Sequence, residues 1–203
     1  LKKLWRTVLI MTIAIPQFIS LLYVSKMFTL NGLFNGFLMD LGIIHTAIDF
    51  WGQPTLARVM VIIINIWIGI PYLMLIATGI LMNIPADLYE SAKIDGASGW
   101  QQYTKITLPY MLFVTGPYLL TSFTGNINNF NVIYLLTRGE PLQIGNSAGD
   151  TDLLVTWLYK LTVDQQKYNM GAVIGIFTFV VLAVVSLITY RSSGSYKDEE
   201  AFK

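Results

Sequence analysis

The sequence predicts an all-α membrane protein with about four transmembrane helices. Of its 203 residues, 54% are hydrophobic and only 12% are charged, whereas soluble chains carry about 25% charged residues on average. The apolar residues gather in four runs, each long enough to cross a hydrocarbon layer of about 30 Å as a helix. A single polar segment, residues 84–109, separates the second run from the third.

The four apolar runs occupy residues 4–22, 56–82, 110–136 and 170–190. The first run is expected to extend to about residue 28, with Pro16 as a packing kink of the kind that membrane helices tolerate. Residues 29–55 and 137–164 are more polar, and we expect loops and short helices there on the outer side. An amphipathic helix is predicted at residues 151–161.

The basic residues favour one side of the membrane in this arrangement. Eight of the 13 Lys and Arg residues fall in the two chain ends and in segment 84–109. Because cytoplasmic segments carry the excess of Lys and Arg, both ends and this segment are predicted to be cytoplasmic. Residues 1–203 then form one transmembrane domain, with a cytoplasmic loop at 84–109 and a cytoplasmic tail at 191–203.

The composition argues against several kinds of chemistry. The chain has no cysteine and a single histidine, His45, so we expect no disulfide, no thiol nucleophile and no metal site. It has a net charge of +1 and no basic block, which argues against nucleic-acid binding. No Gly-x-x-x-x-Gly-Lys-Ser/Thr motif is present to bind ATP. We also find no catalytic constellation in the apolar runs, so the chain is not expected to be an enzyme.

Segment 84–109 contains start and stop signals for two short helices, which we expect to lie outside the bilayer. Its charges would each cost about 2.5–3.5 kcal/mol at the membrane centre. Pro85 suits a first helical position, and Asp95-Gly96 is a turn signal that ends this helix. Ser98 can cap a second helix, and Pro109 is expected to mark its end. Two short amphipathic helices at an angle indicate a docking loop.

The third apolar run is unusually rich in uncharged polar residues. Ser122, Asn126 and Asn129 fall on one stripe at positions i, i+4 and i+7 of a helix. Amide side chains donate and accept hydrogen bonds without carrying charge, which suits a neutral polyhydroxyl ligand, and the rings of Tyr72 and Tyr118 could pack on sugar faces. The alternative is that these amides only join neighbouring helices.

The polar loop carries a recognisable motif. The loop resembles the EAA loop of binding-protein-dependent ABC importer permeases. Three stretches carry the likeness: Glu90-Ser91-Ala92, in which Ser91 replaces the middle Ala, Asp95-Gly96-Ala97, and Ile106-Thr107-Leu108-Pro109. The resemblance implies a type I importer permease core whose coupling helix sits in a cleft of a cytoplasmic ATPase subunit. The residues that it implies for ATPase coupling are Glu90, Ser91, Ala92, Asp95, Gly96 and Ala97. An ordinary amphipathic helix on the membrane surface is the alternative, although such helices are rich in Lys and Arg.

Almost the whole chain resembles the larger permease subunit of maltose/maltodextrin-type importers. The stretches that carry the likeness are 65–72, 126–131, 135–141 and 151–155. The resemblance implies a sugar site lined by Asn65, Ile68, Gly69, Tyr72, Ser122, Asn126 and Asn129. Asn131 replaces an apolar family residue and is excluded from this set. The family core has further spanning helices upstream, so the chain, which begins at Leu1, is expected to be a fragment.

We therefore expect a permease subunit of an ATP-driven importer of a neutral sugar, maltose or maltodextrin by preference, in the bacterial plasma membrane. Its expected partners are a second permease subunit, two cytoplasmic ATPase subunits and an extracellular solute-binding protein. The chain itself is expected to bind no cofactor, because ATP would sit on the ATPase subunits. Three alternatives are a permease for another oligosaccharide, a proton- or sodium-coupled secondary carrier, which usually has an intramembrane carboxylate, and a scaffold protein.

Overall fold

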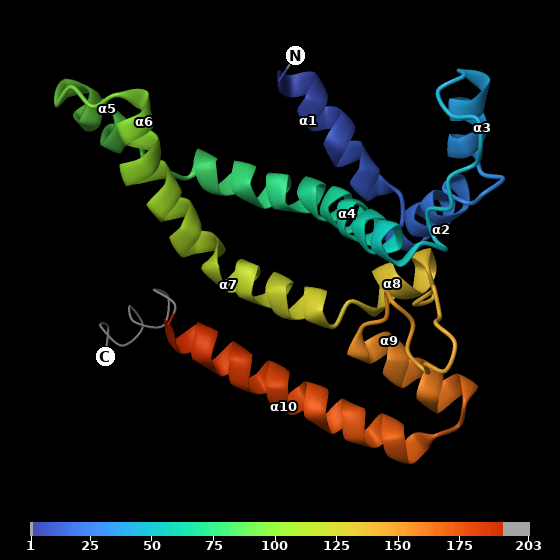
Figure 1. The fold of residues 1–203 in the computed structure, drawn as a ribbon. Helices are drawn as coiled ribbons and strands as arrows, with labels where there is room; N and C mark the ends of the chain where they lie inside the picture. The colour runs from blue at the N-terminus through green and yellow to red at the C-terminus, as the bar shows by residue number, and fades with distance from the viewer. Residues whose placement is uncertain (1, 193–203) are drawn as a thin grey trace. The chain divides into compact units, whose positions relative to one another are not determined.

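The structure is a computed structural model that describes residues 2–192, and it is helical without a strand over that range (Figure 1). The helices are α1 (Lys2–Met11), α2 (Gln17–Met27), α3 (Leu33–Asp40), α4 (Pro54–Met82), α5 (Ala86–Ile94), α6 (Gly99–Gln102), α7 (Leu108–Ile127), α8 (Phe130–Leu136), α9 (Leu154–Tyr159) and α10 (Tyr168–Ser192). A 3₁₀ turn follows α1 at Thr12–Ala14, and π-helical segments occupy Tyr103–Thr107 and Lys160–Asp164. Of the predicted tail at 191–203, residues 193–203 lie outside the described part of the chain.

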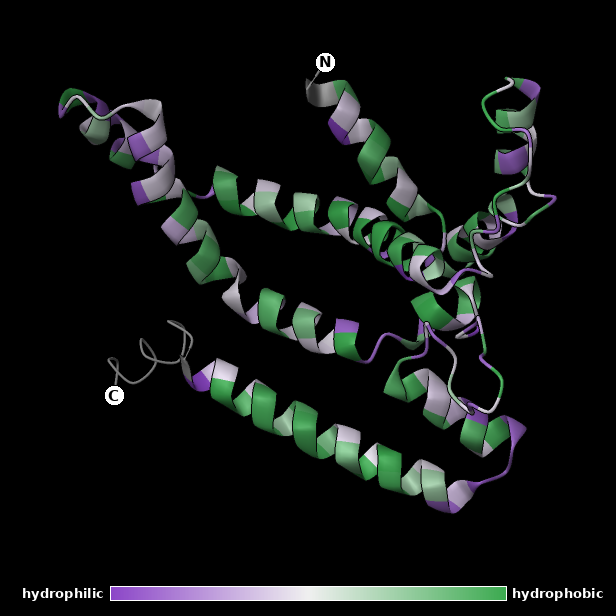
Figure 2. Ribbon diagram, viewed as in Figure 1, coloured by the Kyte–Doolittle hydropathy of each residue, from purple (hydrophilic) through white to green (hydrophobic). Residues whose placement is uncertain are grey.

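Three described helices are long and apolar enough to cross a membrane: Pro54–Met82, Gly99–Ile127 and Tyr168–Arg191. Figure 2 shows α4 and α10 as predominantly hydrophobic along their length, whereas polar residues gather in the connecting segments. The predicted second and fourth runs are therefore confirmed as helices of spanning length. The bent pair Leu4–Ala14 and Gln17–Met27 makes a fourth span if it crosses as one unit, so the prediction of about four spans holds.

The first apolar run is not the single kinked helix that the sequence predicts. Its two halves, Leu4–Ala14 and Gln17–Met27, meet at an angle of 100°. Ile15 is extended, with φ −89° and ψ 127°, because the ring of Pro16 disfavours a helical conformation in the residue before it. Pro16 thus ends one helix and becomes the N-cap of the next.

The third run also differs from its prediction as one helix over residues 110–136. Helix α7 ends at Ile127, and Asn129 becomes the N-cap of α8, where its side chain accepts a hydrogen bond from the Val132 N–H at 3.3 Å. Asparagine favours caps over helix interiors because its side chain competes for backbone hydrogen bonds. Asn129 is therefore not on a continuous helical stripe with Ser122.

At the other end of this run, Pro109 does not end a helix as predicted. The helix that starts at Gly99 continues through Pro109 to Ile127. The π-helical segment just before Pro109 shifts the Leu108 N–H to the Tyr103 carbonyl, and such local adjustments let a membrane helix accommodate proline.

The described chain divides into two compact units. Unit 1 comprises the described residues of Leu1–Pro71 together with Asn126–Val180. Its core joins α2, α4 and α8 through buried side chains such as Leu21, Ile64 and Val132. The predicted short helix in residues 29–55 is α3, and the one predicted at 151–161 is the shorter α9.

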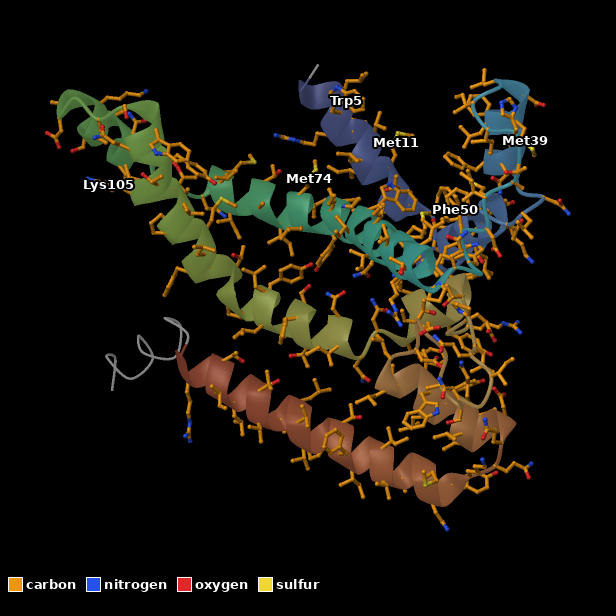
Figure 3. All side chains as sticks on the ribbon, viewed as in Figure 1. Trp5, Met11, Met39, Phe50, Met74 and Lys105 are labelled. Carbon is orange, nitrogen blue, oxygen red and sulfur yellow. The ribbon has the colours of Figure 1, made fainter. Side chains whose placement is uncertain are left out.

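Aromatic rings complete the packing of unit 1. Phe28, Phe34 and Phe50 lie with ring centroids 4.7–5.7 Å apart; Phe50 is labelled in Figure 3. Tyr134 of α8 and Tyr159 of α9 lie 5.2 Å apart edge to face. A side-chain hydrogen bond with Tyr134 raises the pKa of Tyr159 above its ordinary value, because it stabilises the neutral Tyr159 phenol.

Unit 2 comprises Tyr72–Gly125 and the described residues of Val181–Lys203. It contains α5, α6 and most of α7. Thr124 of α7 and Ser186 of α10 share a hydrogen bond of 3.4 Å, a type of contact that helps helices associate in membranes.

One buried amide organises the segment after α3. Asn35 is 0% exposed, donates to the Thr29 and Ile48 carbonyls at 3.1 and 2.9 Å, and accepts from the Ile48 N–H at 2.9 Å. Asn35→Ala would leave these groups without partners, at about 1–3 kcal/mol, and should lower the Tm of the detergent-solubilised protein by at least about 3 °C. Asn31→Ala, at an exposed position, should leave the Tm unchanged. Equal Tm values for the two variants would contradict the anchoring role of Asn35.

Candidate functional site

Three predicted asparagines come together in unit 1. Asn65 of α4 donates through Nδ2 to Oδ1 of Asn126 at 2.7 Å, and Asn129 donates through Nδ2 to Oδ1 of Asn65 at 3.1 Å. We call this set the amide cluster. Asn65 bridges residues that lie 61 and 64 positions away in the sequence, so the cluster ties α4 to the junction between α7 and α8. Asn129 reaches it from its capping position.

Ile68 and Gly69 follow Asn65 by three and four residues and so share its face of α4. Ile68 is half-buried and packs against the core of unit 1, which makes it in part a packing residue. Gly69 is exposed, and no atom lies within 4 Å of where a side chain would begin. The helix surface beside the amide cluster is therefore open at Gly69.

The other two predicted site residues, Tyr72 and Ser122, lie in unit 2. Tyr72 is 51% exposed, and its ring lies 5.6 Å from that of Tyr118 at an interplanar angle of 52°. Ser122 is half-buried. The sequence-based site set omits Tyr118, although its position one helical turn from Ser122 signals a shared face.

The predicted coupling residues build the turn between α5 and α6. The Ala97 N–H bonds to the Ala92 carbonyl at 2.9 Å, and the Gly96 N–H bonds to the Lys93 carbonyl at 3.0 Å. This pair of bonds defines a Schellman motif, which needs a left-handed residue after the helix. Gly96 supplies it with φ +76°, and Asp95 is the C-cap. The Asp-Gly-Ala part of the motif is thus explained by backbone geometry.

The second helix of this loop is equally well defined. Ser98 forms a capping box with Gln101, whose side chain accepts from the Ser98 N–H at 2.8 Å. The hydroxyls of Tyr89 and Thr107 lie 2.7 Å apart and join α5 to the π-helical segment. We call residues 84–109 the coupling loop from here on.

The surface of the coupling loop combines charge, apolar area and a hollow. Glu90 is exposed, and neither of the two ion pairs found within residues 2–192 includes it. Ile94 and Trp100 are 86% and 72% exposed. A cavity of about 380 Å³ is lined by Ala92, Asp95, Gly96, Ala97, Gln101, Gln102, Lys105 and Ile106, and Figure 3 labels Lys105 on this loop. Ile94 and Trp100 thus add exposed apolar area to the surface of the coupling loop.

The sequence-based set of coupling residues missed Ile94 and Trp100. Their signal was available, because both are large apolar residues in a segment that the sequence predicts to lie outside the bilayer. In the part of the chain that the structure describes, no group of three His, Cys, Asp or Glu side chains could hold a metal ion.

The described chain thus has three helices of membrane-spanning length, or four if the bent pair counts as one span, and a two-helix loop between α4 and α7. Residues 1–194 match the family model described as binding-protein-dependent transport system inner membrane component, and the chain belongs to this family.

Several transporter proteins are similar to this chain. The galactooligosaccharides transport system permease protein GanP of Bacillus subtilis (strain 168) is 38% identical over an alignment of 206 positions. The alignment covers 98% of this chain and 47% of GanP. The maltodextrin transport system permease protein MdxF of the same organism is 35% identical, with coverages of 98% and 47%. The maltose/maltodextrin permease MalF of Vibrio cholerae is 39% identical, with coverages of 94% and 37%. The chain spans about half the length, or less, of these relatives.

The fold is similar to solved transporter structures. A bacterial ABC transporter involved in the import of the acidic polysaccharide alginate matches with a TM-score of 0.72 and 28% identity, over 87% of this chain and 60% of that chain. The alginate transporter in complex with an alginate pentasaccharide-bound periplasmic protein matches with a TM-score of 0.71 and 27% identity, over the same shares.

The Schellman turn allows a direct test within the coupling loop. Alanine at φ +76° costs about 1–2 kcal/mol, so Gly96→Ala should open the end of α5 more often. Trypsin cleavage of the detergent-solubilised protein at Lys93 or Lys105 should then be at least about fivefold faster. Gly99→Ala is the matched control, because Gly99 has an ordinary φ and open space around it. Equal cleavage rates for both variants would contradict this geometry.

Proposed function

We propose that this chain is a permease subunit of an ATP-driven importer that carries a neutral oligosaccharide across the bacterial plasma membrane. The observation that supports the proposal is the coupling loop, two short capped helices in a chain of the binding-protein-dependent transport family. We also propose that the coupling loop and both ends of the chain lie in the cytoplasm.

The proposed sugar site consists of Asn65, Ile68, Gly69, Tyr72, Ser122, Asn126 and Asn129. The amide cluster supports a sugar ligand because its donors and acceptors already pair with one another. Sugar hydroxyls can replace those partners one for one, so that no amide is left without a hydrogen bond in the membrane. Helix α7 has no Asp, Glu, Lys or Arg, which favours a neutral ligand over an ion.

We propose a maltodextrin as the substrate, with a galactooligosaccharide as the competing candidate. Curated relatives of both kinds have similar identity to this chain. Both ligands are neutral and rich in hydroxyls, so the amide cluster fits either. Uptake of labelled maltotriose and galactotriose, by cells that lack and then regain the intact gene, distinguishes them.

The proposed partners are a second permease subunit, two cytoplasmic ATPase subunits and an extracellular solute-binding protein. Glu90 is proposed to pair with an Arg of the ATPase, with Ile94 and Trp100 supplying apolar contact. The continuous helix Gly99–Ile127 supports coupling, because it begins in the coupling loop and reaches the proposed sugar site. ATP would be bound by the ATPase subunits.

The role of the amide cluster is tested by Asn126→Leu. The change removes the Asn126 Oδ1 atom, which accepts a hydrogen bond from Asn65, and with it the amide that would bind the sugar. Each lost hydrogen bond is worth about 1–3 kcal/mol. We expect labelled sugar uptake to fall at least about tenfold while the amount of protein in the membrane is unchanged. Asn131→Leu makes the same change at an exposed residue of α8 outside the cluster and should transport normally. Normal uptake by Asn126→Leu would reduce the cluster to a packing role.

Coupling is tested by reversing the charge of Glu90. Glu90→Lys places two cations together at the proposed ATPase contact, and losing such a pair costs about 2–5 kcal/mol. Uptake should fall at least about tenfold, with the complex still recovered intact. Asp40→Lys, the same kind of change on α3, is the control and should keep uptake. Wild-type uptake by Glu90→Lys would refute its role.

A further inference from the structure

A cavity between α2 and α3 lies outside both the proposed sugar site and the coupling loop. Its volume is about 680 Å³, which is within the usual range for sites that bind small molecules. We call it the α2–α3 cavity. Positions three or four apart share one face of a helix, and each helix turns one such face toward it. The lining includes Tyr23, Lys26 and Met27 of α2 and Gly36, Phe37 and Asp40 of α3.

The turn between the two helices holds the walls of this cavity in place. The buried Asn35 amide donates to the Thr29 carbonyl at 3.1 Å, and the Gly32 N–H bonds to the same carbonyl at 2.9 Å. Gly32 also lets α3 begin directly against the end of α2, because a side chain there would overlap the Met27 carbonyl. The cavity is therefore preformed, and a preformed site loses little conformational entropy when a ligand binds.

Two opposite charges line the cavity and take no part in holding the fold. Lys26 lies in the last turn of α2, and Asp40 is the last residue of α3. Both are exposed, and neither belongs to the two ion pairs found within residues 2–192. An ammonium donates hydrogen bonds to an anion, and a carboxylate accepts them from a cation. The two side chains together suit a ligand that carries both an anionic and a cationic group.

Much of the remaining lining is apolar and uncovered. Tyr23 and Phe37 are 69% and 58% exposed, and Leu33, which also lines the cavity, is 75% exposed. The chain belongs to a family of inner membrane components, and α2 is half of an apolar pair that could cross a membrane as one span. Aromatic residues, with a lysine near the end of such a helix, are typical of the boundary between hydrocarbon and lipid headgroups.

We propose that the α2–α3 cavity binds a phospholipid with a zwitterionic primary-amine headgroup, phosphatidylethanolamine. Lys26 donates to its phosphate, Asp40 accepts from its ammonium, and Phe37 contacts the first carbons of an acyl chain. A purely anionic headgroup would bring a negative charge to Asp40 with no cation to pair with it. A second protein subunit is disfavoured as the occupant, because Lys and Asp are depleted from the buried centres of protein interfaces. The proposal is independent of which solute the chain carries.

The test measures bound lipid and not uptake. The intact complex is placed in phosphatidylcholine nanodiscs with a trace of phosphatidylethanolamine that carries a photoreactive group near its glycerol, and labelled peptides are mapped after illumination. Wild type should be labelled within residues 23–40. No atom lies within 4 Å of where a side chain at Gly36 would begin, so Gly36→Leu fills the cavity and should lower this labelling at least about fivefold.

Gly79→Leu is the matched control for this variant. It adds the same side chain at another helical glycine with open space around it, and it should leave the labelling of residues 23–40 unchanged. Equal labelling in wild type and Gly36→Leu would overturn the proposal. An unlabelled segment 23–40 in wild type, as when another subunit covers the cavity, would overturn it as well.

The headgroup is tested by competition with unlabelled lipid. In wild type, phosphatidylethanolamine should halve the labelling at a mole fraction at least about fivefold lower than phosphatidylglycerol requires. Asp40→Asn keeps the size of the side chain but removes the charge that pairs with the ammonium, so this preference should disappear. Asp164→Asn, at another exposed acidic residue of unit 1, should keep it. A preference that survives in Asp40→Asn would overturn the assignment of the headgroup.

Discussion

The continuity of the helix Gly99–Ile127 is the constraint on which the proposed coupling depends. It starts at the capping box of the coupling loop and reaches Asn126 in its last turn. Backbone hydrogen bonds must be satisfied internally in hydrocarbon, so a helix that contains Pro109 and Pro117 needs local adjustments to stay unbroken. The π-helical segment at Tyr103–Thr107 provides one of them. In the proposed function, a force on the coupling loop would act on the same helix that carries Asn126.

The second constraint concerns those polar groups. An amide in a membrane must find a partner, and Asn65, Asn126 and Asn129 find one another. Such bonds between membrane helices are worth only about 0.6 kcal/mol on average. They are weak enough to be exchanged for a ligand that offers both donors and acceptors. In the proposed function, the cluster joins its helices when it is empty and binds a neutral sugar when one arrives.

The sequence predicts the fold well where one physical effect dominates. Helices α4 and α10 follow from uninterrupted apolar length, and the α5–α6 turn follows from Asp95-Gly96 and Ser98. It fails where two local effects compete. Pro16 could kink or break a helix, and Asn129 could lie within a helix or cap one. The hydrophobic periodicity does not distinguish between these outcomes. In the structure, the chain bends by 100° at Pro16, and Asn129 becomes the N-cap of α8.

The candidate site shows the same division. The exposure of Glu90 and the role of Gly96 are local and could be predicted. The pairing of Asn65 with Asn126 joins residues 61 positions apart, and only resemblance to a known family indicated it. The ion pair of Arg58 with Asp150 spans 92 positions, and no sequence pattern predicts it. The assignment of these residues to sugar binding and ATPase coupling is a proposal.

The most direct test of the central claim is sugar uptake by proteoliposomes that contain the intact complex. With the sugar-loaded solute-binding protein outside and ATP enclosed with the ATPase subunits, labelled maltotriose should accumulate, and ionophores that collapse proton and sodium gradients should not affect it. Uptake that persists without ATP and stops when those gradients are collapsed would contradict the account.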